Sequence, residues 1–84
     1  MKKIRKITII GLGLMGGSLA LAIKNKGLPY FITGYDLNKE FLKEALVAQA
    51  IDRSTENLKE SVKDAQLIII ATPLKSYESI FKEI

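Results

Sequence analysis

The fold of this chain is decided by residues 7–24, which read ITIIGLGLMGGSLALAIK. The first four of these residues are β-branched, as in a short strand buried on both faces of a sheet. Glycines with the spacing GxGxxG follow at Gly11, Gly13 and Gly16, and residues 19–23 are good helix formers. The stretch therefore predicts a strand, a tight turn and a helix, in that order.

The chain then alternates between strand-like and helix-like segments. Gly27 and Pro29 end the first helix. Residues 30–35 are aromatic and β-branched and predict a second strand, and Asn38 is a candidate N-cap for a second helix. The apolar face of that second helix would consist of Phe41, Leu42, Ala45 and Leu46.

The second half of the chain continues the alternation. Residues 50–53 leave room for a short edge strand, and Ser54 or Thr55 can cap a short third helix. Residues 67–71, LIIIA, are the clearest candidate for a buried strand. The last apolar residues have the spacing of an amphipathic helix: Tyr77, Ile80, Phe81 and Ile84.

This order of elements predicts an α/β fold, with a parallel sheet and right-handed crossovers. A doubly wound, Rossmann-type sheet with the strand order 3-2-1-4 fits it. We expect residues 1–84 to form the N-terminal part of a dinucleotide-binding domain, truncated after the βαβαβ-type half and the following helix. The strand at residues 67–71 would then have an apolar edge, from which we expect self-association, as a homodimer or in another form.

Each glycine of the motif has a physical task if a dinucleotide binds. Gly11 permits the tight turn, Gly13 lets a pyrophosphate approach the backbone, and Gly16 lets the helix pack closely on the sheet. The N–H groups at the start of the helix attract phosphate oxygens. The alternative is a tight turn between strand and helix that binds nothing.

An acidic residue completes the pattern, because Asp36 stands 36 − 16 = 20 residues after the last motif glycine. Its carboxylate can accept hydrogen bonds from an adenosine ribose, and it would repel a 2′-phosphate, which favours NAD over NADP. The alternative is a turn residue at the end of a strand, or a partner of Asn38 in capping.

Thr72 and Pro73 follow the strand at residues 67–71 and would face the crevice where the strand order reverses. We therefore expect them on the nicotinamide side of the cofactor. A plain turn that ends the strand is the alternative interpretation.

Composition excludes several function classes. The chain has no cysteine and no histidine, so it offers no disulfide, no thiolate or imidazole metal ligand and no histidine base. The net charge of +4 comes from a short basic start, Lys2, Lys3, Arg5 and Lys6, ahead of a neutral body. We therefore expect no nucleic-acid partner. No apolar run approaches the roughly 20 residues of a membrane span, and we expect a cytoplasmic location.

Three strings, GLGLMGGSLALAIK, GYDLN and IIIATP, occur here in an order and spacing that resemble the N-terminal half of the prephenate/arogenate dehydrogenase family. The double glycine followed by serine is the more specific part of this resemblance. Ala50 and Gln66 depart from the family pattern, which often has glycine and aspartate there.

The resemblance implies an NAD-dependent oxidative decarboxylation of prephenate or arogenate in tyrosine biosynthesis. It implies that Leu14 and Met15 contribute backbone N–H groups to a phosphate loop formed with the three motif glycines. It also implies that Asp36 is the ribose ligand and that Thr72 and Pro73 line the cofactor. The essential histidine of the family would lie beyond residue 84, so we expect residues 1–84 alone to be inactive.

Two other functions remain open at this point. One is a different NAD(P)-dependent dehydrogenase of the wider 6-phosphogluconate/β-hydroxyacid superfamily. The other is a non-catalytic module that binds NAD.

Overall fold

A computed structural model describes residues 4–71, which form a four-stranded parallel sheet with the strand order β3-β2-β1-β4. Along the chain the elements are β1 (Lys6–Ile10), α1 (Leu14–Asn25), β2 (Phe31–Tyr35), α2 (Lys39–Val47), β3 (Arg53–Thr55), α3 (Leu58–Val62) and β4 (Leu67–Ile70). The predicted strand order and the doubly wound α/β class are confirmed.

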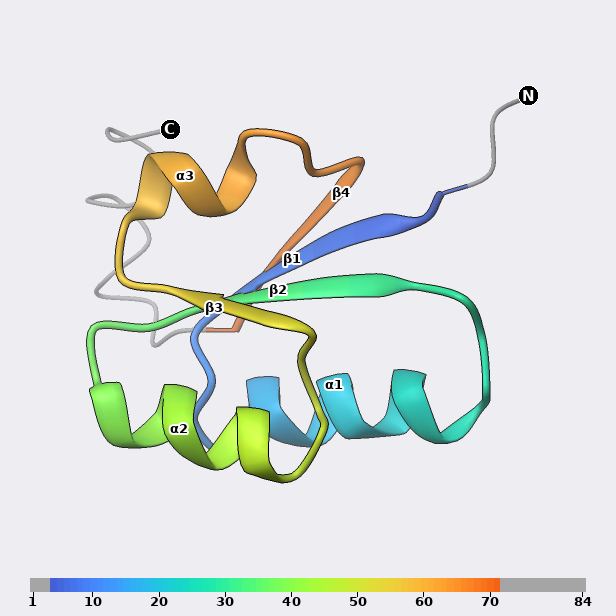
Figure 1. Cartoon of the computed structure of the whole chain (residues 1–84), viewed down its shortest axis with the longest axis horizontal. Coiled ribbons are helices and arrows are strands. Elements are labelled where there is room, and N and C mark those ends of the chain that lie inside the picture. Colours follow the sequence, from blue (N-terminus) through green and yellow to red (C-terminus); the bar gives the residue numbers. More distant parts are fainter. Residues whose placement is uncertain (1–3, 72–84) are drawn as a thin grey trace.

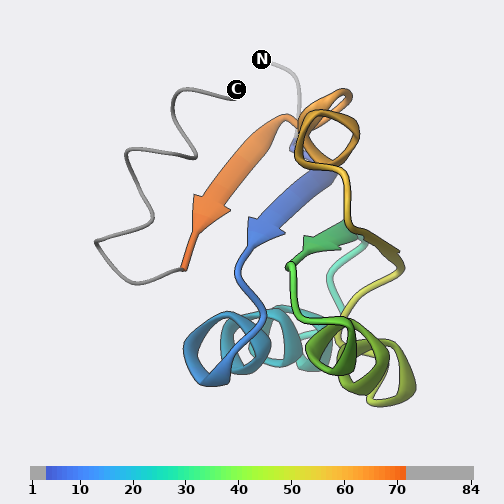
Figure 2. The same cartoon turned by 90° about the vertical axis from the view of Figure 1, so that its left-hand side faces the viewer.

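The helices form two layers, one on each face of the sheet. α1 and α2 lie together on one face, and α3 covers part of the other (Figure 1). The view in Figure 2 separates these layers. Right-handed crossovers require this arrangement: the connections through α1 and α2 step from β1 toward β3, whereas the connection through α3 steps back past β1 to β4.

The larger hydrophobic core lies between the sheet and the α1/α2 layer. It contains nine buried residues: Ile7, Ile9, Leu12, Ala20, Ile32, Leu42, Ala45, Ala50 and Ile51. A smaller cluster on the other face joins Ile10 to Leu58 of α3. Because α3 has only five residues, it leaves part of that face of the sheet less covered.

Two boundary predictions were wrong. The edge strand occupies Arg53–Thr55 rather than residues 50–53, because Ala50 and Ile51 are buried in the larger core. The cap of α3 is Asn57, whose side chain accepts a hydrogen bond from Glu60 N, and not Ser54 or Thr55. Those two residues pair with β2 instead, which removes them from the helix start.

The second helix begins as predicted. Asn38 is its N-cap, and its side-chain oxygen accepts hydrogen bonds from Glu40 N and Phe41 N. Such a cap satisfies backbone donors that the first turn of a helix leaves without intrahelical partners.

β4 is the strand that the sequence predicts, but it is less buried than expected. Leu67 and Ile68 remain 40% and 38% exposed. Within residues 4–71, β4 pairs with β1 alone, so it lies at the edge of the described sheet. Residues 72–84 lie outside the described residues, and with them Thr72, Pro73 and the helix predicted from the spacing of the last apolar residues.

Gln66 joins the beginning of β1 to the segment before β4. Its side-chain oxygen accepts hydrogen bonds from Arg5 N at 2.7 Å and from Lys6 N at 3.0 Å. One of the two departures from the family pattern therefore has a local structural role.

Candidate functional site

The candidate site lies at the carboxyl ends of β1 and β2. The glycine loop, residues 11–16, leaves β1 there, and Asp36 directly follows β2. The strand order reverses between β1 and β4, which is where a doubly wound sheet opens a crevice for ligands. The topology thus brings the motif and the acidic residue to one edge of the sheet.

Gly11 and Gly16 are glycines for reasons internal to the fold. Gly11 has a φ of 96°, in the left-handed region, and its N–H donates to Tyr35 O at 2.8 Å. At Gly16 an added Cβ would lie 1.7 Å from the carbonyl oxygen of Gly11, so α1 could not start where it does with any larger residue. These two positions therefore say little about a ligand.

Gly13 is different, because nothing in the described chain demands glycine there. Its φ of −67° is open to any residue. An added Cβ would meet only the Cε2 atom of Phe41, at 3.8 Å, which is an ordinary van der Waals contact. The fold would accept a side chain at this position, and the space beside Gly13 stays open.

The first turn of α1 presents backbone donors beside that space that have no acceptor within residues 4–71. The first helical bond runs from Gly17 N to Gly13 O at 2.9 Å, so the N–H groups of Leu14 and Met15 precede the hydrogen-bond ladder. Gly13 is the N-cap without a side-chain hydrogen bond, and the first turn carries no acidic residue. The partial positive charge at this helix end is therefore not offset by a neighbouring carboxylate in its own turn.

Asp36 is half-buried and accepts two backbone hydrogen bonds. Its Oδ2 accepts from Leu12 N at 2.8 Å, and its Oδ1 accepts from Asn38 N at 2.9 Å. The second bond is the turn role considered as an alternative for this residue. The first ties the glycine loop to the end of β2. Each carboxylate oxygen accepts more than one hydrogen bond, so these contacts leave capacity for a ligand.

The sequence did not predict the packing that fixes the glycine loop against the sheet. The side chain of Leu12 is buried against Gly34 in β2, where an added Cβ would lie 2.6 Å from Leu12 Cδ1 and 2.9 Å from Ile51 Cδ1. A glycine inside a strand was the available signal, because it marks a close approach of other groups. Leu12 is thus fixed twice, through its N–H and through its side chain.

Exposed apolar side chains flank the loop. Met15 and Leu37 are 77% and 79% exposed, one in the first turn of α1 and one directly after Asp36. Phe41 was predicted on the apolar face of α2, and it instead lies half-exposed beside Gly13. Three exposed apolar side chains, Met15, Leu37 and Phe41, therefore border the site.

Among residues 4–71 no group of three or more His, Cys, Asp or Glu side chains is arranged to hold a metal ion. Over the same residues, no helix is long and apolar enough to cross a membrane.

Comparison with solved structures places the chain beside a dehydrogenase. A structure titled as prephenate dehydrogenase from A. aeolicus in complex with hydroxyphenyl propionate and NAD+ superimposes with a TM-score of 0.88 at 28% identity. The match covers 98% of this chain and 29% of that one. A structure of a diketoreductase superimposes with a TM-score of 0.78, also at 28% identity, and covers 99% of this chain and 38% of that one.

Curated relatives agree. The chain is 38% identical to prephenate dehydrogenase of Bacillus subtilis over 78 aligned residues. These residues make up 93% of this chain and 21% of the relative. It is 35% identical to prephenate dehydrogenase of Lactococcus lactis over 80 aligned residues, and this alignment covers 95% of this chain and 22% of the relative. The resemblance to prephenate dehydrogenases is thus confirmed, and the chain spans about a fifth of the length of these relatives.

A family model covers nearly the whole chain. The family is described as "NADP oxidoreductase coenzyme F420-dependent", and its model matches residues 6–84, all but the first five residues. The glycine loop, Asp36 and all four strands of the sheet lie inside this match. The chain therefore belongs to the NADP oxidoreductase coenzyme F420-dependent family.

Proposed function

We propose that this chain binds NAD and is the dinucleotide-binding segment of a prephenate or arogenate dehydrogenase. The observation that best supports NAD binding is the open space at Gly13. The fold requires the glycines at positions 11 and 16, but it does not require one at position 13. A bare backbone beside unused N–H donors is what a pyrophosphate needs for close approach.

The proposed binding mode follows from the geometry of the loop. The pyrophosphate lies over Gly13 and accepts hydrogen bonds from the N–H groups of Leu14 and Met15, with the positive end of α1 behind them. The adenosine ribose lies beside Asp36, whose carboxylate accepts from its hydroxyl groups. Thr72 and Pro73 stay a prediction for the nicotinamide side, since they lie outside the described residues.

The choice between NAD and NADP depends on Asp36. The family description names NADP, and the glycerol-3-phosphate dehydrogenase of Bacillus subtilis, 29% identical over 90 residues, is named for NAD(P)+. The carboxylate of Asp36 is held toward the glycine loop by its bond to Leu12 N. A 2′-phosphate placed there would meet a fixed negative charge, so we propose NAD.

The reaction proposed for the whole protein is oxidative decarboxylation of prephenate or arogenate. Bound NAD supplies the hydride acceptor. The residues of this chain bind and orient the cofactor, and the chain has no histidine to act on substrate protons. We therefore propose that substrate-binding and catalytic groups come from the remainder of a longer protein, as the share of the relatives that this chain spans suggests.

Titration calorimetry with NAD and NADP tests this proposal, on a protein that contains residues 1–84. We expect NAD to bind more tightly than NADP. Asp36→Ala should weaken the binding of NAD and reduce the preference for NAD over NADP, because it removes both the ribose acceptor and the charge that repels a 2′-phosphate. Tighter binding of NADP to the parent protein would show that the role given to Asp36 is wrong.

The substrate is tested separately on the full-length protein that contains residues 1–84, by NADH formation with prephenate, with arogenate and with glycerol 3-phosphate. The relatives named prephenate dehydrogenase share 35–38% identity with this chain, against 29% for the glycerol-3-phosphate dehydrogenase of Bacillus subtilis. We expect turnover with one of the first two compounds. Turnover with glycerol 3-phosphate alone would replace the proposed activity while leaving the cofactor proposal intact.

A further inference from the structure

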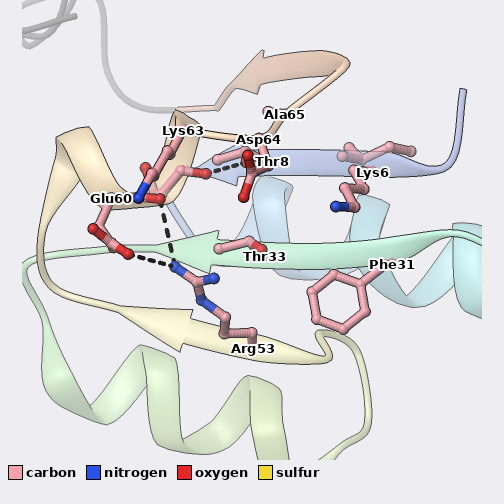
Figure 3. A pocket seen from close by; sticks show the side chains of 11 residues that line it. Lys6, Thr8, Phe31, Thr33, Arg53, Glu60, Lys63, Asp64 and Ala65 are labelled. Atoms are coloured by element: carbon pink, nitrogen blue, oxygen red, sulfur yellow. Dashed lines mark hydrogen bonds and ion pairs between the residues drawn. The ribbon is translucent and has the colours of Figure 1, made fainter.

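A small polar cavity lies on the α3 side of the sheet, away from the glycine loop. Its volume is about 60 Å³, enough for roughly four water-sized groups. Its floor is formed by β1, β2 and β3, and α3 with the turn after it forms the roof (Figure 3). No residue of the glycine loop lines it.

The floor contains a buried hydroxyl group that has no hydrogen-bond partner within residues 4–71. Thr33 is only 7% exposed and lies in register between Thr8 and Arg53 on the neighbouring strands (Figure 3). The Oγ1 of Thr8 donates to Ser61 O in α3. Among residues 4–71, no hydrogen bond joins the Oγ1 of Thr33 to any group. A buried hydroxyl is normally satisfied, so this one points to something bound in the cavity.

Cationic side chains outnumber acidic ones in the lining of the cavity, three against two. The carbonyl oxygens of Glu60 and Ser61 already accept from Arg53 and Thr8, and the Glu60 carboxylate lies 3.7 Å from Arg53. The remaining cations of the lining are Lys6 and Lys63, and the remaining acidic group is Asp64. A ligand rich in acceptors fits this surplus.

An aromatic wall adds a second preference. Phe31 is 45% exposed, and its ring lies at the end of the cavity near Lys6 (Figure 3). A ring face that remains in water gains by covering an apolar group. An oxyanion with a short apolar tail uses both the donors and the ring, whereas inorganic phosphate uses the donors alone.

We propose that this cavity binds a small carboxylate whose oxygens accept from Thr33 Oγ1 and the Lys6 ammonium group, and whose apolar tail lies against Phe31. This carboxylate site shares no residue with the glycine loop, so its test does not depend on the proposed function.

The test is an NMR titration of the 84-residue chain with sodium propionate, followed at the Thr33 methyl group and the neighbouring amides. We expect saturable shifts around the cavity at millimolar propionate. Sodium chloride at the same ionic strength serves as the reference, and sodium phosphate is titrated in parallel. Absence of saturation with propionate, equal shifts with chloride, or tighter binding of phosphate would each overturn the proposal.

Two of four substitutions, Thr33→Val and the control Lys43→Gln, separate a specific site from an effect of net charge. Thr33→Val should raise the Kd for propionate roughly three- to tenfold, because one hydrogen bond to the ligand is lost. Lys6→Gln should also weaken propionate binding, Asp64→Asn should strengthen it, and Lys43→Gln, on the opposite layer, should leave it unchanged. Weakening by Lys43→Gln equal to that by Lys6→Gln would reduce the effect to net charge and refute the site.

A thermal melt without ligand checks the premise. Thr33→Val should not lower the melting temperature, because its hydroxyl has no partner to lose. The same substitution one strand away, Thr8→Val, should lower it, because that hydroxyl bonds to Ser61 O. A Thr33→Val variant that melts as early as Thr8→Val would show that the hydroxyl is already satisfied, and the proposal would fail.

Discussion

Replacing Gly13 by serine should make the protein more stable and at the same time weaken its binding of NAD. Gly13 is the N-cap of α1, has an extended backbone and makes no side-chain cap. A serine hydroxyl in that position can accept from a backbone N–H of the first turn. The added Cβ meets only Phe41 Cε2, at 3.8 Å, so the fold has room for it.

The magnitude follows from two small terms. Serine is better than glycine at an N-cap by a few tenths of a kcal/mol. Replacing glycine where the backbone is compatible adds about 0.4–1 kcal/mol by restricting the unfolded chain. The sum, about 1 kcal/mol, corresponds to a rise in melting temperature of about 4–8 °C for a domain of this size. The same side chain occupies the approach of the pyrophosphate, so the Kd for NAD should rise at least about tenfold, or 1.4 kcal/mol.

Calorimetric melting and NAD titration on the same samples measure both effects. Gly17→Ala is the matched control, because its added Cβ lies 3.5 Å from Leu12 O, an ordinary contact, and inside α1 rather than at its start. It should also raise the melting temperature but leave the Kd for NAD unchanged. A Gly13→Ser variant that binds NAD normally, or that melts well below the parent, would refute the interpretation of Gly13 as a ligand position.

Three further substitutions test contacts that stabilise the fold. Gly34→Ala should destabilise the protein by about 1–3 kcal/mol, since its Cβ would lie 2.6 Å from Leu12 Cδ1; urea unfolding measures this, and no loss would mean that Leu12 moves freely. Asp52→Ala should cost about 1–3 kcal/mol by the same assay, because Asp52 Oδ2 accepts from Ile32 N at 2.7 Å and from Lys24 Nζ; a neutral result would show that both contacts are dispensable. Asn57→Ala should cost about 1 kcal/mol through loss of the α3 cap, visible as faster amide exchange in α3, and unchanged exchange would count against that cap.

The sequence was most informative where one local rule determined the structure. The strand at residues 7–10, the glycine turn and the Asn38 cap each follow from neighbouring residues, and together they predicted the strand order. The errors came where tertiary packing decided. Ala50 and Ile51 are buried in the core, which moved the edge strand to Arg53–Thr55 and the α3 cap to Asn57.

The candidate site shows the same division. Its residues at the carboxyl ends of β1 and β2 were predicted from spacing. The hydrogen bond from Leu12 N to Asp36 and the packing of Leu12 on Gly34 were not predicted. They depend on side-chain geometry between positions that lie far apart in the sequence, by 24 residues (36 − 12) for the first contact and by 22 residues (34 − 12) for the second. Only the structure could separate Gly13, which the fold does not require, from Gly16, which it does.

The most direct test of NAD binding at the glycine loop is an NMR map of amide shifts in the 84-residue chain during titration with NAD. We predict saturable shifts concentrated at Gly13, Leu14 and Met15, with a second group at Asp36. Shifts that do not saturate, or that concentrate elsewhere on the sheet, would contradict it.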